Sequence, residues 1–222
     1  MSDDQEYGRD AQTRGDPPPR GRPVLSLDEK TKRQKAIVDV ALRLFQEEGF
    51  ASVSMRRVGK EVKLSPMALY RYFPSKLDIL ARLWSHILAL AFERVAQATR
   101  DQDTHQEALH LAAKAYVAFW LNNTDHYHLV FMTSGVSGDD VKSFVGNPET
   151  IAQYDVFFDL VAGVLDLDRA SPSVKVATDG LICNLHGIMH SLITMQGYDW
   201  TGSDQLIADA VARVSQNTRP AR

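Results

Sequence analysis

Residues 45–76 read FQEEGFASVSMRRVGKEVKLSPMALYRYFPSK, and this stretch decides the fold that we expect. Gly49 is a typical stop for one helix, and Ser54 is a typical N-cap for a second. Ser65 followed by Pro66 is the usual start of a third, because proline fits the first position of a helix. The stretch therefore predicts three consecutive helices, of which the second and third are short and joined by a tight turn.

The helix that precedes Gly49 has its own start signal. Ser26-Leu27-Asp28-Glu29 has the spacing of a capping box, and apolar residues then recur at helical spacing: Ile37, Val40, Ala41, Leu44 and Phe45. Its early turns carry Lys30, Lys32, Arg33 and Lys35, where the helix dipole favours acidic side chains instead. These cations indicate an external anionic partner such as phosphate, with a solvated face as the alternative.

The rest of the chain also shows helical periodicity. Ser75 and Asp78 open a long helix that runs to about residue 98. The further helices that we expect cover residues 109–120, a short segment 127–132, residues 148–165 after a loop at 134–147, residues 172–192 and residues 204–214. No stretch alternates with period two. The sequence therefore predicts an all-α protein of about nine helices.

Composition and charge narrow the class of protein. The 222-residue chain is 44% hydrophobic, which is ordinary for a soluble globular protein. It has one cysteine, Cys183, no signal-peptide pattern and no apolar run near the roughly 18 residues of a membrane span. We expect a cytoplasmic protein with no membrane partner. Residues 29–80 carry 11 Lys/Arg against 6 Asp/Glu, a net +5, although the chain as a whole is at -3. The positive charge therefore coincides with the short helices.

The first three helices resemble the N-terminal domain of the TetR family of bacterial transcriptional regulators. The resemblance covers about residues 26–80 and is carried by Ala41, Leu44, Phe45, Gly49, Phe50, Ser54, Val58, Leu69, Tyr70, Tyr72, Phe73, Ser75, Lys76 and Leu80. The chain departs from the family at Gly59, Val62 and Lys63, where members usually carry Ala, Ala and Gly. The resemblance implies a helix-turn-helix domain that binds double-stranded DNA.

The same resemblance implies which side chains meet DNA. Arg56, Tyr70, Tyr72 and Lys76 would hold phosphates, while Pro66, Met67, Ala68 and Arg71 would approach base edges. The chemistry agrees, because arginine can donate to both O6 and N7 of guanine and apolar side chains meet the thymine methyl. Arg71 is the expected main specificity residue. Half-buried packing is the alternative role for the two tyrosines.

The C-terminal half resembles a TetR-type regulatory domain of a subclass with a Trp-His-Gly signature. The residues concerned are Tyr116 to Trp120, Tyr127 with Phe131, and His186-Gly187, although Ile182 or Cys183 stands where the Trp is expected. The division that follows is a disordered tail at 1–25, a DNA-binding domain at 26–74 and a ligand-binding and dimerisation domain at 75–217. Arg14, Arg20 and Arg22 of the tail either touch DNA or are simply solvated.

A dimer is expected because helix-turn-helix proteins usually read two half-sites about 34–36 Å apart. The helix at 172–192 carries a strip of small residues: Gly180, Asn184, Gly187 and Ser191. Together with Leu206, Ile207, Ala210 and Val214 of the last helix it predicts a homodimer interface, and hence a palindromic operator. An ordinary core within one chain is the alternative.

Aromatic and sulfur-containing residues concentrate in the same half and indicate a pocket for an apolar or aromatic small-molecule effector. The candidate lining residues are Phe92, Tyr116, Phe119, Trp120, Tyr127, Phe131, Phe158, His186 and Met189. Core packing is the alternative for most of them. The histidine pairs at 186/190 and 126/128 lack the further ligands of a zinc site. We expect no metal, no cofactor and no catalytic residues, so the chain should not be an enzyme.

These features predict a repressor that an apolar effector releases from its operator. The alternative is an effector-independent architectural or adaptor protein, with the same DNA head and a helical half that binds another protein. A large cavity would favour the first, and a filled core with an exposed apolar patch would favour the second. A helical small-molecule enzyme is a third hypothesis and would require turnover.

Overall fold

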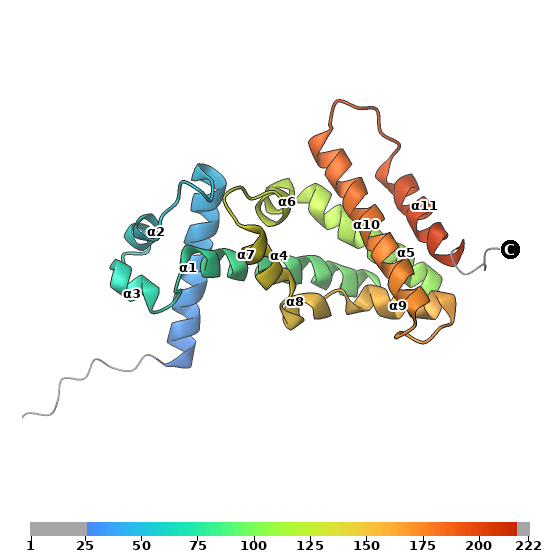
Figure 1. Ribbon diagram of the computed structural model, residues 1–222, viewed down its shortest axis with the longest axis horizontal. Helices are drawn as coiled ribbons and strands as arrows, with labels where there is room; N and C mark the ends of the chain where they lie inside the picture. Colours follow the sequence, from blue (N-terminus) through green and yellow to red (C-terminus); the bar gives the residue numbers. More distant parts are fainter. Residues whose placement is uncertain (1–25, 217–222) are drawn as a thin grey trace, which may run out of the picture.

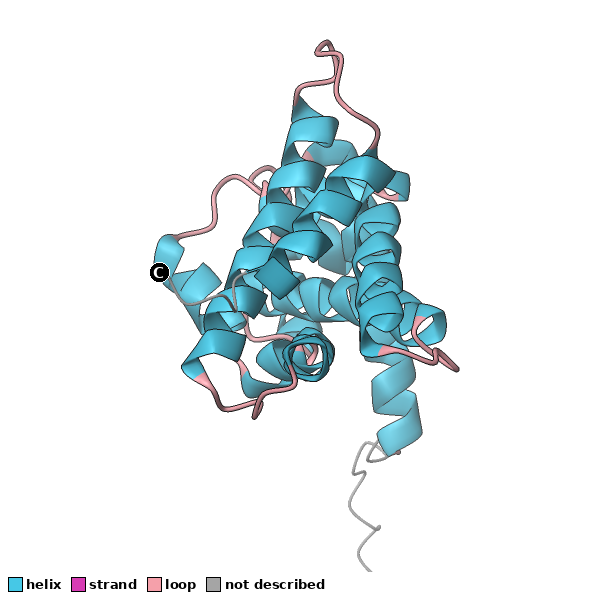
Figure 2. Cartoon of the chain, turned by 90° about the vertical axis from the view of Figure 1, so that its right-hand side faces the viewer, coloured by secondary structure: helices cyan, strands magenta, loops and turns pink. Residues whose placement is uncertain are grey.

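The computed structural model describes residues 26–216, apart from the side chain of Ser143. This part of the chain contains eleven α-helices and no strand, so the all-α prediction is confirmed (Figure 2). The helices are α1 (Leu27–Glu48), α2 (Met55–Glu61), α3 (Pro66–Tyr70), α4 (Lys76–Ala98), α5 (His105–Asn122), α6 (Thr124–Phe131), α7 (Gly138–Val145), α8 (Pro148–Ala152), α9 (Asp155–Leu165), α10 (Pro172–Thr194) and α11 (Ser203–Gln216). The tail predicted at residues 1–25 lies outside the described residues.

The molecule is elongated, with a small helical head at one end (Figure 1). Helices α1 to α3 form this head, and α4 runs from it into a larger bundle of α5, α9, α10 and α11. Buried apolar side chains of both parts form one continuous core. The domain boundary expected after residue 74 falls in the loop before α4, and it stays a prediction. None of the described helices is both long and apolar enough to cross a bilayer.

The predicted helix starts are present as hydrogen bonds. Ser26 and Glu29 form the complete capping box at the start of α1. The next three caps each accept the backbone N–H of the residue three positions later at 3.2 Å: Ser54 from Arg57, Ser65 from Ala68, and Ser75 from Asp78. These bonds satisfy N–H groups that a helix leaves unpaired in its first turn. Local chemistry therefore fixes the head's helix boundaries.

Two expectations for residues 134–165 are wrong. The expected loop at 134–147 contains α7, which begins with a second capping box, Ser137 with Asp140. The single helix expected from residue 148 to 165 is divided into α8 and α9. At the division the backbone N–H of Tyr154 bonds to the Ile151 carbonyl at 2.9 Å, which is three-residue spacing, and the chain turns there. These two differences raise the helix count from nine to eleven.

The turn between α2 and α3 depends on two of the three residues at which the chain departs from the family pattern, Lys63 and Gly59. Lys63 adopts a positive φ of 55°, the left-handed conformation that glycine adopts most easily. A Cβ on Gly59 would lie 2.9 Å from the Leu64 carbonyl oxygen, closer than real contacts allow. The missing side chain at Gly59 therefore permits the close approach of α2 and the turn.

Candidate DNA interface and ligand cavity

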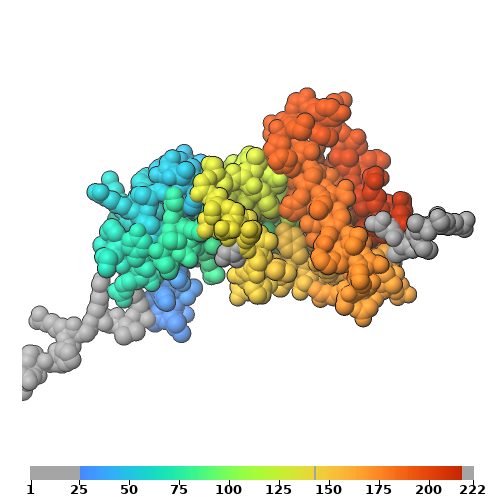
Figure 3. Space-filling model, in the orientation of Figure 1, coloured from blue at the N-terminus to red at the C-terminus, as the bar shows by residue number. Residues whose placement is uncertain are grey.

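The outer surface of the head carries the side chains predicted to meet DNA. Met67 is 79% exposed and Tyr70 is 48% exposed, whereas Leu69 and Phe73 are buried. Arg56, Pro66 and Arg71 are exposed, while Ala68, Tyr72 and Lys76 are half-buried. The structure thus places all eight predicted residues on α2, on α3, in the turn after α3 and at the start of α4, at one end of the molecule (Figure 3).

Ion pairs divide the cations of the head into two groups. Arg57 bonds to Glu48 at 2.8 Å and to Glu61 at 2.5 Å, and Arg43 also reaches Glu61. Within residues 26–216, Arg56 and Arg71 form no ion pair. Their positive charge is therefore available to phosphate or to a base edge, while Arg57 and Arg43 hold α1 against α2.

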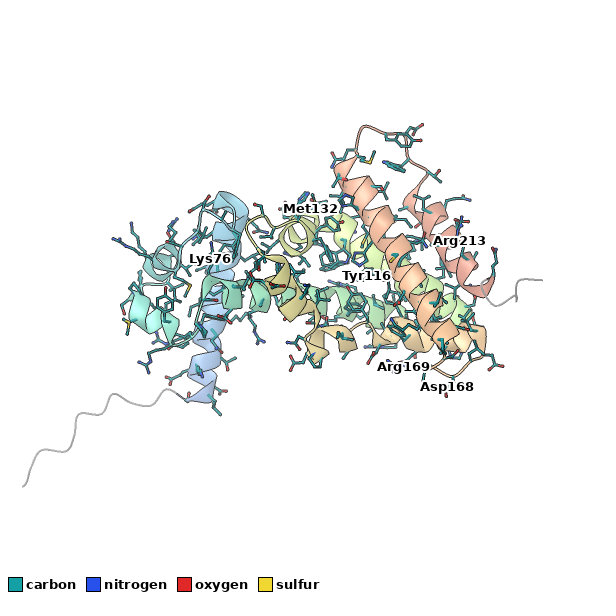
Figure 4. All side chains as sticks on the ribbon, viewed as in Figure 1. Lys76, Tyr116, Met132, Asp168, Arg169 and Arg213 are labelled. Carbon is teal, nitrogen blue, oxygen red and sulfur yellow. The ribbon has the colours of Figure 1, made fainter. Side chains whose placement is uncertain are left out.

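Lys76 has an internal partner that sequence analysis does not reveal. Its Nζ donates to the Phe50 carbonyl at 2.7 Å and lies 4.1 Å from the centre of the Phe50 ring (Figure 4). Partial burial lowers the pKa of this ammonium group. Lys76 therefore connects the loop after α1 to the start of α4. A DNA phosphate would have to share the Lys76 ammonium group with the Phe50 carbonyl.

A cavity of about 650 Å³ lies between α4 and the helices α6 to α10. Its wall is mainly apolar and consists of Trp84, Leu88, Val130, Phe131, Thr133, Val136, Val141, Phe144, Val145, Thr150, Ile151, Tyr154, Phe158, Lys175, Asp179, Ile182 and His186. Val145 and Ile151 are about half exposed, so the cavity opens beside α7 and α8. This size and composition suit a small apolar ligand.

Three of the nine predicted ligand residues line this cavity: Phe131, Phe158 and His186. The other six lie outside the wall: Phe92, Tyr116, Phe119, Trp120, Tyr127 and Met189. Five of these six are buried, and Phe119 is half-buried. Trp120 and Tyr127 place their rings 4.9 and 5.0 Å from Phe131, and so support the wall from behind.

Tyr116 acts on the cavity indirectly, from α5 inside the bundle (Figure 4). Its hydroxyl lies 3.1 Å from the Tyr154 hydroxyl and 3.2 Å from Nε2 of His186, and both of those residues line the cavity. Burial raises the pKa of the Tyr116 phenol and lowers the pKa of His186 to about 4. The His186 ring is therefore neutral near pH 7.

Most of the remaining wall residues are not predicted from the sequence. Val141, Phe144 and Val145 belong to α7, in the segment expected to be a loop. Their spacing of three and four residues, after the Ser137–Asp140 capping box, is the signal that could have found this helix. Trp84 of α4 also lines the cavity and is not among the predicted ligand residues.

The end of α6 is shared between the cavity and the head. Val130, Phe131 and Thr133 line the cavity, while Leu129 and Thr133 border a second hollow together with Phe45 and Phe50 of the head. In Figure 3 the segment α6 to α8, coloured yellow, lies between the head and the C-terminal bundle.

A buried hydrogen bond joins this segment to α4. Nε1 of Trp84 donates to the Leu129 carbonyl at 2.7 Å, and the Trp84 ring packs on Phe144 at 4.9 Å. Because Trp84 also lines the cavity, a bound molecule would touch the helix that leads into the head.

The outer face of α10 and α11 carries a shallow groove. It is lined by Cys183, Asn184, Gly187, Ile188, Ser191, Leu192, Trp200 and Leu206. Gly180, Asn184 and Gly187 of the predicted strip are exposed, which agrees with a contact surface. Ile207, Ala210 and Val214, also assigned to the interface, are buried within the chain instead. In the described part of the chain no cluster of three potential metal ligands occurs.

Comparison with known proteins connects the head to a family. Residues 37–83 match the family of bacterial regulatory proteins called tetR. The transcriptional repressor KstR of Rhodococcus jostii is 37% identical over 75 residues, which are 34% of this chain and 34% of that protein. The chain spans between 34% and 53% of the length of the curated relatives it matches.

Two solved structures resemble most of the chain. That of the regulatory protein SCO4313 has a TM-score of 0.66 at 20% identity, over 86% of this chain and 98% of that one. FadR of Bacillus subtilis, solved with stearoyl-CoA, has a TM-score of 0.64 at 15% identity, over 83% and 99%. At these identities the likeness shows a shared fold.

The family match covers the second half of α1, all of α2 and α3, which include the exposed Arg56 and lead to Arg71, and the start of α4. The shared fold extends through the bundle. Residues 37–83 are thus similar to the tetR family of bacterial regulatory proteins, and over 83–86% of its length the chain shares the fold of these two solved structures.

Proposed function

We propose that this protein is a cytoplasmic repressor that binds a palindromic operator as a homodimer and releases it when an apolar small molecule occupies the cavity. TetR-type regulators are not enzymes, in agreement with the expectation from sequence. The observation that carries the proposal is the apolar cavity of about 650 Å³, which shares the end of α6 with the DNA-binding head. A cavity of this kind supports an effector-responsive regulator over an adaptor.

On this proposal the head reads DNA as the sequence suggested. Arg56 and Arg71, which form no ion pair with residues 26–216, are exposed, as is Met67, so phosphate contacts and base contacts would come from the same head. Paired heads follow from contact between the α10–α11 faces of two copies, because one short helix buries too little surface for strong specificity. FadR of Bacillus subtilis, solved in complex with stearoyl-CoA, supports the idea that this fold can hold a ligand with a long apolar chain.

A gel-shift assay with the region beside the protein's own gene tests DNA binding. Arg71→Ala should weaken binding to this site about tenfold or more, because one bidentate contact to guanine is worth about 1–3 kcal/mol of discrimination. Arg100→Ala is the matched control, since Arg100 is exposed at the far end of α4 and should leave binding unchanged. Equal loss in both variants, or no shift at low salt, would contradict the proposal.

The effector part of the proposal has a separate test. A compound that binds the cavity and prefers the DNA-free conformation must weaken DNA binding. By thermodynamic linkage, DNA weakens the binding of that compound by the same factor. Compounds that raise the melting temperature of the free protein should therefore release the operator. Stabilising ligands that leave operator affinity unchanged would show that the cavity does not control the head.

A further inference from the structure

We infer that the cavity takes an uncharged, largely apolar molecule that carries one hydrogen-bonding oxygen, and that the Tyr154–Tyr116–His186 relay holds that oxygen. This inference names the chemical class of the effector and rests on the proposed function.

Charges around the cavity are already paired. Among residues 26–216, the charged side chains in its wall are Lys175 and Asp179, one turn apart on α10, and their ion pair is 2.8 Å long. Both side chains are at least half exposed, so the pair lies at the mouth and is hydrated. An anionic ligand would therefore have to break this pair to gain a cation.

A further cation beside the wall is also paired with carboxylates. Arg169 lies 6.0 Å from the ring of the wall residue Phe158. Its guanidinium bonds to Asp155 at 2.5 Å and to Asp159 at 3.1 Å. These groups together carry one more negative than positive charge, which disfavours carboxylates and phosphates. A cationic ligand would be stripped of water by the apolar wall, and only exposed, already bonded carboxylates would face it.

The relay supplies the polar contact. Three groups with one donatable proton each, the two tyrosine hydroxyls and the neutral His186 ring, form two internal hydrogen bonds. One proton is therefore left over. Leaving it on Tyr116, which is 1% exposed, would bury an unsatisfied donor. It is accordingly carried by Tyr154 or by His186, at one of the two ends of the relay that line the cavity.

Whichever of Tyr154 and His186 carries the extra proton, the other one offers a lone pair to the cavity. In the arrangement with Tyr154 donating to Tyr116 and Tyr116 donating to Nε2, His186 keeps an Nδ1–H. In the reverse arrangement Tyr154 keeps its O–H and Nδ1 is an acceptor. Within residues 26–216 no side chain or backbone group bonds to Nδ1. A ketone, ester, ether or alcohol oxygen can accept from the free donor in either arrangement, without any ionic partner.

Four probes of similar shape test this class with the purified full chain: octanophenone, phenyloctane, 8-phenyloctanoate and 8-phenyloctylamine. Dissociation constants come from quenching of tryptophan fluorescence, since Trp84 lines the cavity, and from thermal shift. At pH 7.5 we expect the ketone to bind at least about tenfold more tightly than the carboxylate and the amine.

The relay is tested by the ratio of the hydrocarbon's dissociation constant to that of the ketone. This ratio should fall about tenfold in the double variant Tyr154→Phe/His186→Phe, because one hydrogen bond is worth about that factor. The matched control is Tyr127→Phe/His190→Phe, which removes another tyrosine–histidine bond, of 3.2 Å, outside the cavity wall. Its ratio should stay within about twofold of the wild-type value. Both dissociation constants are measured on the same variant, so a general weakening of the fold affects them alike and leaves their ratio unchanged.

Three results would overturn the inference: equal or tighter binding of the carboxylate or the amine, an unchanged ratio in the relay variant, or no binding of any probe. If the probes fail while the same preparation shifts its operator, only the ligand class is wrong. If the probes bind in the expected order but no DNA is shifted, the ligand class stands and the proposed repressor function fails.

Discussion

Acid should destabilise this protein through His186. Burial lowers the pKa of this histidine from 6.5 to about 4 in the folded state. Between these values the unfolded chain binds a proton that the folded chain does not, so stability falls as the pH falls. His186 causes no loss of stability well above pH 6.5. Below that value the free energy of unfolding falls progressively, until the pH reaches about 4. At about 1.36 kcal/mol per pH unit, the largest loss is about 3 kcal/mol, and about 2 kcal/mol of it is expected between pH 7 and pH 5.

Urea unfolding at pH 7 and pH 5 measures this loss. In His186→Phe the titrating group is absent, so the variant should lose about 2 kcal/mol less than the wild type over the same interval. Other groups contribute equally to both proteins and cancel in the comparison. His128→Gln, at an exposed position on α6, should behave like the wild type. The reasoning is refuted if wild type and His186→Phe lose the same stability between the two pH values.

Three further substitutions test the head and its connection to the cavity. Lys63→Gly should raise the free energy of unfolding by about 0.5–1 kcal/mol, because glycine adopts the positive φ without strain; a urea midpoint that falls would contradict this. Leu69→Ala should cost about 2–5 kcal/mol in urea unfolding because Leu69 is fully buried, whereas Met67→Ala should cost less than about 0.5; similar costs would mean that the orientation of α3 is wrong. Trp84→Phe removes the bond to the Leu129 carbonyl and should cost about 1 kcal/mol in the same assay while weakening the effect of ligand on DNA affinity; unchanged coupling would exclude this bond from the response.

The head could be predicted because its determinants are local. Each cap, such as Ser54 or Ser65, bonds to a backbone group three residues away, and the buried positions repeat at helical spacing. Lys76 shows the limit of this reasoning. Its partner, the Phe50 carbonyl, is 26 residues away in sequence, so no local pattern announces that its ammonium group has an internal hydrogen bond.

The cavity was harder to predict because a wall and a core use the same residue types. Trp120 and Phe158 are equally apolar in sequence, yet Trp120 is fully buried behind the wall and Phe158 lines the cavity. Which of them faces empty space depends on how α7 and α8 cover the bundle. Both helices are too short for their periodicity to stand out, and their residues were therefore assigned to a loop or to a longer helix.

The proposed release of DNA requires only a modest free energy, and the end of α6, which borders both the cavity and the head, can supply it. A tenfold to hundredfold loss of operator affinity corresponds to about 1.4–2.7 kcal/mol of difference in ligand binding between two conformations. A single buried hydrogen bond contributes about 0.5–1.5 kcal/mol net. The Leu129 carbonyl accepts from Trp84 and from the Thr133 hydroxyl, and Thr133 borders both the cavity and the hollow against the head. A ligand that disturbs these two bonds would therefore supply a difference of the required size, without any large rearrangement of the bundle.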